Sequence, residues 1–156
     1  RIDYKREQIM DIFFKYLNIF PMPLWLAMMF APKHPLTNRM ARSTSVFGIT
    51  AIHYLLSLIN AMRHGGEAMD LTTLDGISKG LGTKEGALVG WAHFLALDLF
   101  TGAWIYRQCQ RLNAPAWIRI PALLFTLMTG PFGLLIFLLW RGIGARRSEA
   151  LPTMKR

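Results

Sequence analysis

A chain of 156 residues with a net charge of +9 and 53% hydrophobic residues is either a basic soluble protein or a membrane protein. Charged residues make up only 17% of the sequence, against about 25% in an average soluble domain. Four long apolar segments leave too little chain to cover them with a soluble shell, which excludes a soluble globular domain. The basic residues flank these segments, so we expect membrane lipids, and no nucleic acid, as their partners.

The sequence predicts an all-α fold, an integral membrane four-helix bundle with kinked spans. The four predicted spans are residues 16–32, 43–62, 86–106 and 120–140, in a membrane domain of residues 16–140 between basic tails of residues 1–15 and 141–156. An even number of spans places both termini on one side of the membrane. That side carries more Lys and Arg, which favours termini inside.

The first span contains Pro21 and Pro23, which predict an irregularity, with Asn18 about one turn earlier. The connection after the second span is the longest, and within it residues 69–77 predict a short amphipathic turn on the membrane interface.

Polar residues in the second span recur at i, i+3, i+7 and i+10 and share one helix face: Thr50, His53, Ser57 and Asn60. A polar stripe that faces lipid is costly, so we expect it to face the bundle interior. Two roles stay open: hydrogen bonds between helices, or a proton-carrying or substrate-contacting role for His53, because imidazole titrates near neutral pH.

Asp98 is the only formally charged residue in the third span, which is about 30 Å long as a helix. A carboxylate at that depth is costly unless it is paired, protonated or hydrated, so Asp98 is a candidate acid or base. His93 lies five residues earlier and about 140° around the helix axis, so the two cannot form an i,i+4 pair. Asp98 could instead reach His53 or Asn18, and a purely structural pairing stays open.

In the fourth span Pro131 predicts a kink, because proline cannot donate its backbone hydrogen bond. Thr126, Gly130 and Gly133 share one face and would permit close backbone approach. Such a break can open a cavity at mid-membrane, or serve packing alone.

The sequence lacks the residues or motifs that several kinds of active site require. The single cysteine, Cys109, excludes an internal disulfide and a cysteine metal cluster. Four histidines are too few for the His-rich di-iron site of membrane hydroxylases, and the sequence has no dinucleotide fingerprint, P-loop or nucleophile elbow. His53, His93 and Asp98 could in principle bind one metal ion, but we expect no metal and no cofactor.

The run from Gly90 to Ile105, which reads GWAHFLALDLFTGAWI, resembles the signature of the abscisic-acid-deficient-four-like family. Pro121, Thr126 and the run 130–135 resemble the family's last span. The segment from Asn18 to Pro32, which includes Trp25, is similar to its first span, so the resemblance covers nearly the whole predicted membrane domain.

The plant member of that family is needed to make neoxanthin from violaxanthin, a conversion that opens an epoxide and generates an allene without net oxidation. The resemblance therefore implies a cofactor-independent isomerase that acts on a carotenoid or another isoprenoid lipid. Asp98 would be the general acid or base, with His93 or His53 as the complementary group. The expected substrate-binding residues are Asn18, Trp25, Tyr54, Ser57, Trp91, Gly130 and Pro131.

Two other functions stay open. The chain could be a non-enzymatic pigment-binding or assembly subunit of a membrane complex, in which Asp98 and His53 are structural partners. Its possible protein partners are a second copy of the chain, in a homo-oligomer, or the other subunits of such a complex. A small proton-coupled transporter is disfavoured, because four spans without a repeat make a poor alternating-access device. We expect a multi-pass protein of a bacterial inner membrane, or of a plastid membrane in a eukaryote.

Overall fold

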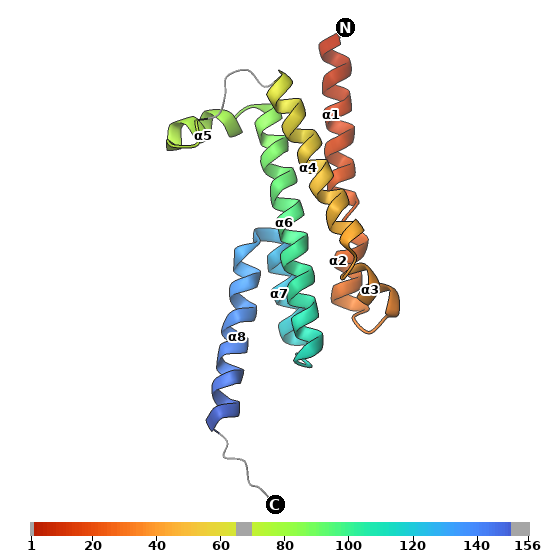
Figure 1. Cartoon of the computed structure of the whole chain (residues 1–156), viewed down its shortest axis with the longest axis vertical. Coiled ribbons are helices and arrows are strands. Elements are labelled where there is room, and N and C mark those ends of the chain that lie inside the picture. Colours follow the sequence, from red (N-terminus) through yellow and green to blue (C-terminus); the bar gives the residue numbers. More distant parts are fainter. Residues whose placement is uncertain (1, 65–69, 151–156) are drawn as a thin grey trace, which may run out of the picture.

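The computed structural model describes residues 2–64 and 70–150, and these residues form helices without any strand (Figure 1). The helices are α1 (Ile2–Ile19), α2 (Met22–Phe30), α3 (Pro35–Met40), α4 (Thr44–His64), α5 (Leu74–Leu81), α6 (Lys84–Arg111), α7 (Ala116–Thr129) and α8 (Pro131–Ala150). The all-α prediction is therefore confirmed. Most of the predicted N-terminal tail is the first part of α1, and residues 151–156 of the predicted C-terminal tail lie outside the described residues.

Three stretches are long and apolar enough to cross a membrane, namely Tyr4–Phe30, Thr44–His64 and Lys84–Arg111. They correspond to the first three predicted spans. The first is interrupted between α1 and α2, where Pro21 precedes α2 and Pro23 lies in its first turn. The irregularity predicted from these prolines is confirmed, because proline can start a helix but cannot continue one.

The prediction of a fourth span, and with it the four-helix bundle, is wrong. Residues 120–140 form parts of two helices, α7 and α8, which pack against each other as a helical hairpin (Figure 1). The reversal occurs at Gly130, whose φ of 58° and ψ of −92° favour glycine, and Pro131 is the first residue of α8. The chain therefore turns back on itself where a kink was expected.

The two helices of the hairpin are in close contact at Gly133. A Cβ atom added at Gly133 would lie 2.2 Å from the Ala122 carbonyl oxygen and 2.2 Å from the Thr126 backbone nitrogen. The Thr126 hydroxyl is fully buried there and donates to the Ala122 carbonyl oxygen at 2.7 Å. The predicted close approach at Thr126 and Gly133 is confirmed, but it joins two halves of what was expected to be one helix.

The hairpin also changes the topology. In Figure 1, α6 runs along the middle of the molecule, α7 returns beside its second half, and α8 descends again beside α7 and past the end of α6. The beginning of α1 and the end of α8 consequently lie at opposite ends of the molecule. The expectation that both ends of the chain share one side, which depended on an even number of spans, is not met.

The buried apolar residues form two clusters of unequal size. The major core joins α2, α6, α7 and α8 and consists of Leu24, Trp25, Met28, Met29, Ala41, Leu99, Ala103, Ile105, Tyr106, Cys109, Ala114, Ala122, Leu123 and Phe137. The minor core joins α1 to the first half of α6 and consists of Leu17, Leu88 and Ala92. Helix α6 therefore contributes to both clusters.

Polar side chains tie the connection after α2 to the second half of α6. The Tyr106 hydroxyl donates to the Pro32 carbonyl oxygen at 2.6 Å, and the Gln110 amide donates to the same oxygen at 2.6 Å. The Arg107 guanidinium donates to the carbonyl oxygen of Ala41. These contacts satisfy backbone carbonyls where helices end and leave acceptors free.

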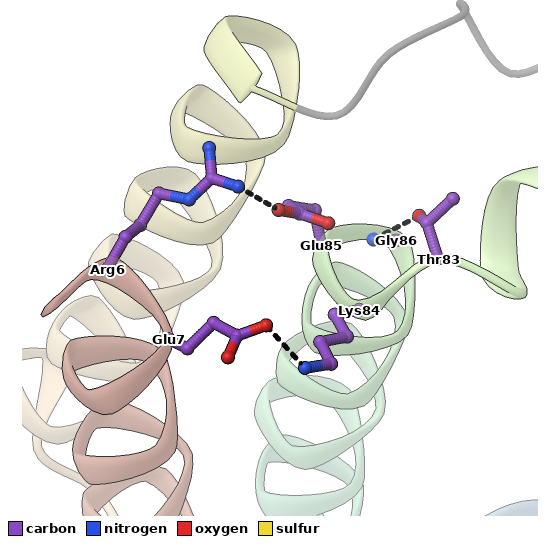
Figure 2. A network of polar contacts seen from close by, with 6 residues as sticks. All are labelled: Arg6, Glu7, Thr83, Lys84, Glu85 and Gly86. Atoms are coloured by element: carbon purple, nitrogen blue, oxygen red, sulfur yellow. Dashed lines mark hydrogen bonds and ion pairs between the residues drawn. The ribbon is translucent and has the colours of Figure 1, made fainter. Parts of the chain in front are cut away.

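At the other end of α6, two charge pairs link it to α1 (Figure 2). Lys84 Nζ lies 2.7 Å from Glu7 Oε1, and Arg6 Nη2 lies 3.5 Å from Glu85 Oε1. The Thr83 hydroxyl caps the first turn of α6 by accepting a backbone hydrogen bond. The contact between α1 and α6 thus depends on one exposed and one partly buried charge pair as well as on the minor core.

The amphipathic element predicted within residues 69–77 corresponds to α5, although Met69 lies outside the described residues. Asp70 organises the turn before the helix, because its carboxylate accepts hydrogen bonds from the Thr72 hydroxyl and N–H, and these lower its pKa. Helix α5 points away from the long axis of α6 (Figure 1). Leu71 and Leu74 are exposed there, as expected of an element that meets a lipid interface.

Candidate functional site

Asp98 lies at the midpoint of α6, where the tip of the α7–α8 hairpin meets that helix. A Cβ atom added at Gly130 would lie 2.5 Å from Asp98 Oδ1, so the carboxylate rests directly on the backbone of the hairpin turn. The next residue, Leu99, belongs to the major core, and Leu95 packs against the minor core. The carboxylate therefore stands at the boundary between the two cores.

The Asp98 carboxylate is partly buried, and among the described residues no hydrogen bond or ion pair engages it. The side chain that acts on it electrostatically is His93. The His93 imidazole is exposed and packs edge-on against Tyr54 of α4, with ring centroids 5.5 Å apart. A carboxylate without a fixed partner and a nearby imidazole form an arrangement that can exchange protons with a ligand.

His53 occupies a different environment. It is 8% exposed and its ring is surrounded by the edges of Phe13, Tyr16 and Phe20, with centroid distances of 5.8, 5.2 and 5.6 Å. Within the described part of the chain, its Nδ1 atom has no hydrogen-bond partner. The contacts of His53 are thus with α1 and the residue that follows it, and none of them involves Asp98.

Two further residues of the polar stripe on α4 also face inward, whereas Asn60 is half-buried. Thr50 and Ser57 are buried, as the stripe predicted. Their hydroxyls donate to carbonyl oxygens of their own helix, Thr50 to Phe47 and Ser57 to His53, both at 2.9 Å. The inward orientation is confirmed, whereas these hydroxyls bond within α4 and not to a neighbouring helix.

Two of the expected substrate-binding residues bond to each other. Trp91 Nε1 donates to Asn18 Oδ1 at 3.0 Å, which joins α6 to α1, and the Asn18 amide donates to the Phe14 carbonyl oxygen at 2.7 Å. Trp25 lies deeper, on α2, where its ring occupies the space that a side chain at Gly102 would need. Trp25 is therefore a core residue. It packs against Gly102, which lies one turn after Asp98 on the same face of α6.

Pro131 is exposed at the hairpin tip beside Gly130, whereas Gly130 itself is buried. The structure thus brings Asp98 and Gly130 together at the hairpin tip beside Pro131, while His93 and the Trp91–Asn18 pair lie one to two turns earlier along α6. No group of three His, Cys, Asp or Glu side chains suited to a metal ion occurs in the parts of the chain that the structure describes. The chemistry that these residues offer is proton transfer.

Sequence reasoning missed two features of this region. The aromatic enclosure of His53 could have been found, because Phe13, Tyr16 and Phe20 recur at i, i+3 and i+7. The contact between Asp98 and Gly130 joins residues far apart in the sequence, and only the unforeseen hairpin creates it.

A scan against protein families matches residues 12–137 to the family described as ABA DEFICIENT 4-like. The match covers most of the chain. This protein belongs to the ABA DEFICIENT 4-like family. No match to a curated protein or to a solved structure was found.

The family match begins within α1 and ends within α8, so it includes both sides of the hairpin and all of α6. The resemblance inferred from the third and fourth predicted spans is thereby confirmed. Family membership agrees with the membrane character that the three long apolar stretches indicate.

Proposed function

We propose that this protein is a membrane-embedded isomerase that opens a carotenoid epoxide to an allene by acid–base chemistry, without a cofactor. The observation that carries the proposal is the Asp98 carboxylate, which rests on the hairpin turn at Gly130 and has no hydrogen-bond partner among the described residues. A buried or partly buried charge without a protein partner is costly to maintain, and function is the common reason for keeping one.

The reaction balances with two proton-transferring groups. The base removes the proton from the vinylic carbon beside the epoxide, and the electron pair of that C–H bond becomes the second double bond of the allene. The adjacent C–O bond breaks, and the acid protonates the oxygen to give a hydroxyl group. The substrate neither gains nor loses electrons. One carboxylic group, that of Asp98, and one imidazole are therefore enough to supply the acid and the base.

His93 is a better complement to Asp98 than His53. Its imidazole acts electrostatically on the Asp98 carboxylate, and it is exposed. His53 is enclosed by three aromatic rings that leave it 8% exposed. A proton donor must reach the reacting atom, which the position of His93 permits.

A polyene could lie along the face of α6 that carries Asp98. Phe94 and Trp91, at i−4 and i−7 from Asp98, share that face and are 57% and 43% exposed. Exposed aromatic surface next to an unpaired carboxylate suits a long apolar molecule with one polar end. Trp91 and Asn18 would then contact the substrate beyond the reacting group.

The test is expression of the chain in a carotenoid-producing host, followed by chromatography of the extracted pigments. Asp98→Asn should lower the amount of isomerised product at least about 100-fold. Asp75→Asn is the matched control, because Asp75 lies in the exposed ion pair with Lys79 on α5 and should leave the product unchanged. Equal product from Asp98→Asn and wild type, at equal amounts of folded protein, would refute the proposal.

Two further variants separate the histidines. His93→Gln should reduce the product strongly, whereas His53→Gln should retain it. If neither wild type nor variants convert any carotenoid while pigment co-purifies unchanged with the protein, the chain is a pigment-binding or assembly subunit. The exposed Phe94 and Trp91 would serve that function equally well.

A further inference from the structure

A second feature lies on the other side of α6, where the beginning of α4 meets the second half of α6. The two helices form a groove of about 660 Å³, and its lining residues are Arg42, Thr44, Phe47, Gly48, Ala51, Phe100 and Arg107. Phe100 follows Asp98 by two residues, which places it about 200° around the helix axis. The groove is therefore separate from the face that carries Asp98.

One end of the groove is positively charged. Arg42 precedes α4, and its charge acts on the guanidinium of Arg107, which a hydrogen bond to the Ala41 carbonyl oxygen holds in place. Among the described residues, neither arginine forms an ion pair with a carboxylate. Two like charges held close together without a counter-ion favour the binding of an anion.

The sequence around this end offers no acidic group to neutralise the arginines. No Asp or Glu occurs between Asp11 and Glu67, and none occurs between Asp98 and Glu149. Helix α4 begins at Thr44, a groove-lining residue, so the positive end of the helix dipole adds to the charge of the arginines.

The rest of the groove is apolar. The rings of Phe47 and Phe100 meet edge-on with centroids 5.6 Å apart, and Ala51 continues the wall. A Cβ atom added at Gly48 would find nothing within 4 Å, so the groove is open at this residue. From Arg107 back to Phe100 the helix rises about 10 Å, which matches the first part of an acyl chain.

We propose that this groove binds an anionic membrane phospholipid, with its phosphate between Arg42 and Arg107 and an acyl chain along Phe47, Gly48 and Phe100. Charge complementarity selects the phosphate, and the apolar extension selects a lipid over a soluble anion. Basic pockets between membrane helices bind anionic headgroups by the same physics. The site does not depend on the reaction proposed for Asp98.

The test uses the purified full chain in detergent with an equimolar mixture of phosphatidylglycerol and phosphatidylcholine of identical acyl chains, and native mass spectrometry of the retained lipid. The wild type should retain phosphatidylglycerol preferentially. Arg42→Gln and Arg107→Gln should each lower that preference about five-fold. Arg111→Gln is the matched control, since Arg111 lies one turn beyond Arg107 and outside the groove, and it should leave the preference intact.

Gly48→Leu tests the apolar half independently of charge. The new side chain enters open space, so the protein should fold normally while the retention of phosphatidylglycerol falls to that of phosphatidylcholine. Equal losses from Arg111→Gln and Arg107→Gln would overturn the proposal in favour of diffuse surface attraction. Displacement of the lipid by millimolar glycerol phosphate would also overturn it, because the site would then recognise a simple anion.

Discussion

The two ends of α6 are held by different kinds of interaction. Around its second half, α2, α7 and α8 build the major core, and side chains such as Tyr106 and Gln110 bond to backbone carbonyls. Around its first half, α1 contributes to a minor core of three buried residues, and two charge pairs add to it. The comparison indicates a rigid half that fixes the hairpin and a less tightly packed half beside it, with Asp98 at the boundary.

The largest effect should come from filling a close backbone contact in the rigid half. Gly133→Leu places a side chain where the backbone of α7 already lies, 2.2 Å from a Cβ atom, so the hairpin cannot close. We expect a loss of more than about 3 kcal/mol in unfolding free energy, measured by thermal unfolding in detergent. Gly142→Leu is the control on the same helix, because a Cβ atom there meets nothing within 4 Å. Similar losses in both variants would show that the hairpin is not closely packed.

A smaller effect is expected at the boundary itself. Gly130→Ala forces a side chain onto a residue with positive φ and pushes a Cβ atom to 2.5 Å from Asp98 Oδ1. The unfolding free energy should fall by about 1–2 kcal/mol, and product formation should fall with it. In the double variant with Asp98→Ala, part of the stability loss should be recovered, since the clashing carboxylate is gone. Strict additivity of the two losses would contradict the contact.

The less tightly packed half should respond more weakly. Trp91→Phe removes the hydrogen bond from Nε1 to Asn18 while keeping an aromatic ring, which should cost about 1 kcal/mol of unfolding free energy. Trp117→Phe serves as the control, because Trp117 is 68% exposed on α7. A larger loss of unfolding free energy in Trp117→Phe than in Trp91→Phe would contradict a stabilising role for the hydrogen bond between Trp91 and Asn18.

The smallest effect is expected for the charge pair between α1 and α6. Glu7→Gln removes the partner of Lys84, and both side chains are more than half exposed. Thermal unfolding at low ionic strength should show a slight decrease in Tm that disappears in about 1 M salt, where charges are screened within a few ångströms. A decrease that persists at high salt would mean that the pair acts through packing.

Local elements of this fold could be predicted from the sequence. The long apolar run around Asp98 predicted α6, the two prolines after Phe20 predicted the break between α1 and α2, and the spacing of Thr50, His53 and Ser57 predicted their burial. In each case the signal and its consequence lie within one or two helical turns. Physical rules of helix geometry were sufficient there.

The hairpin could not be predicted in the same way. A run of 21 uncharged, mostly apolar residues has the length of a membrane span, and a Gly-Pro pair is compatible with either a kink or a reversal. The outcome depends on the sign of φ at Gly130 and on whether Gly133 finds a partner in α7, which are tertiary properties. The position of Asp98 on the turn follows from that reversal, so the sequence could identify the carboxylate without identifying its surroundings.

The half-length hairpin also has a consequence for the shape of the molecule in a bilayer. With α6 across a bilayer, as the proposed function requires, α7 and α8 beside its second half would give the protein a larger cross-section in one leaflet than in the other. The tip at Gly130 would then form a step at mid-depth, with Asp98 at the inner edge of that step. A lipid-dissolved molecule would reach the carboxylate by diffusing sideways through the less occupied leaflet, so the two faces of the membrane would not be equivalent as sources of substrate.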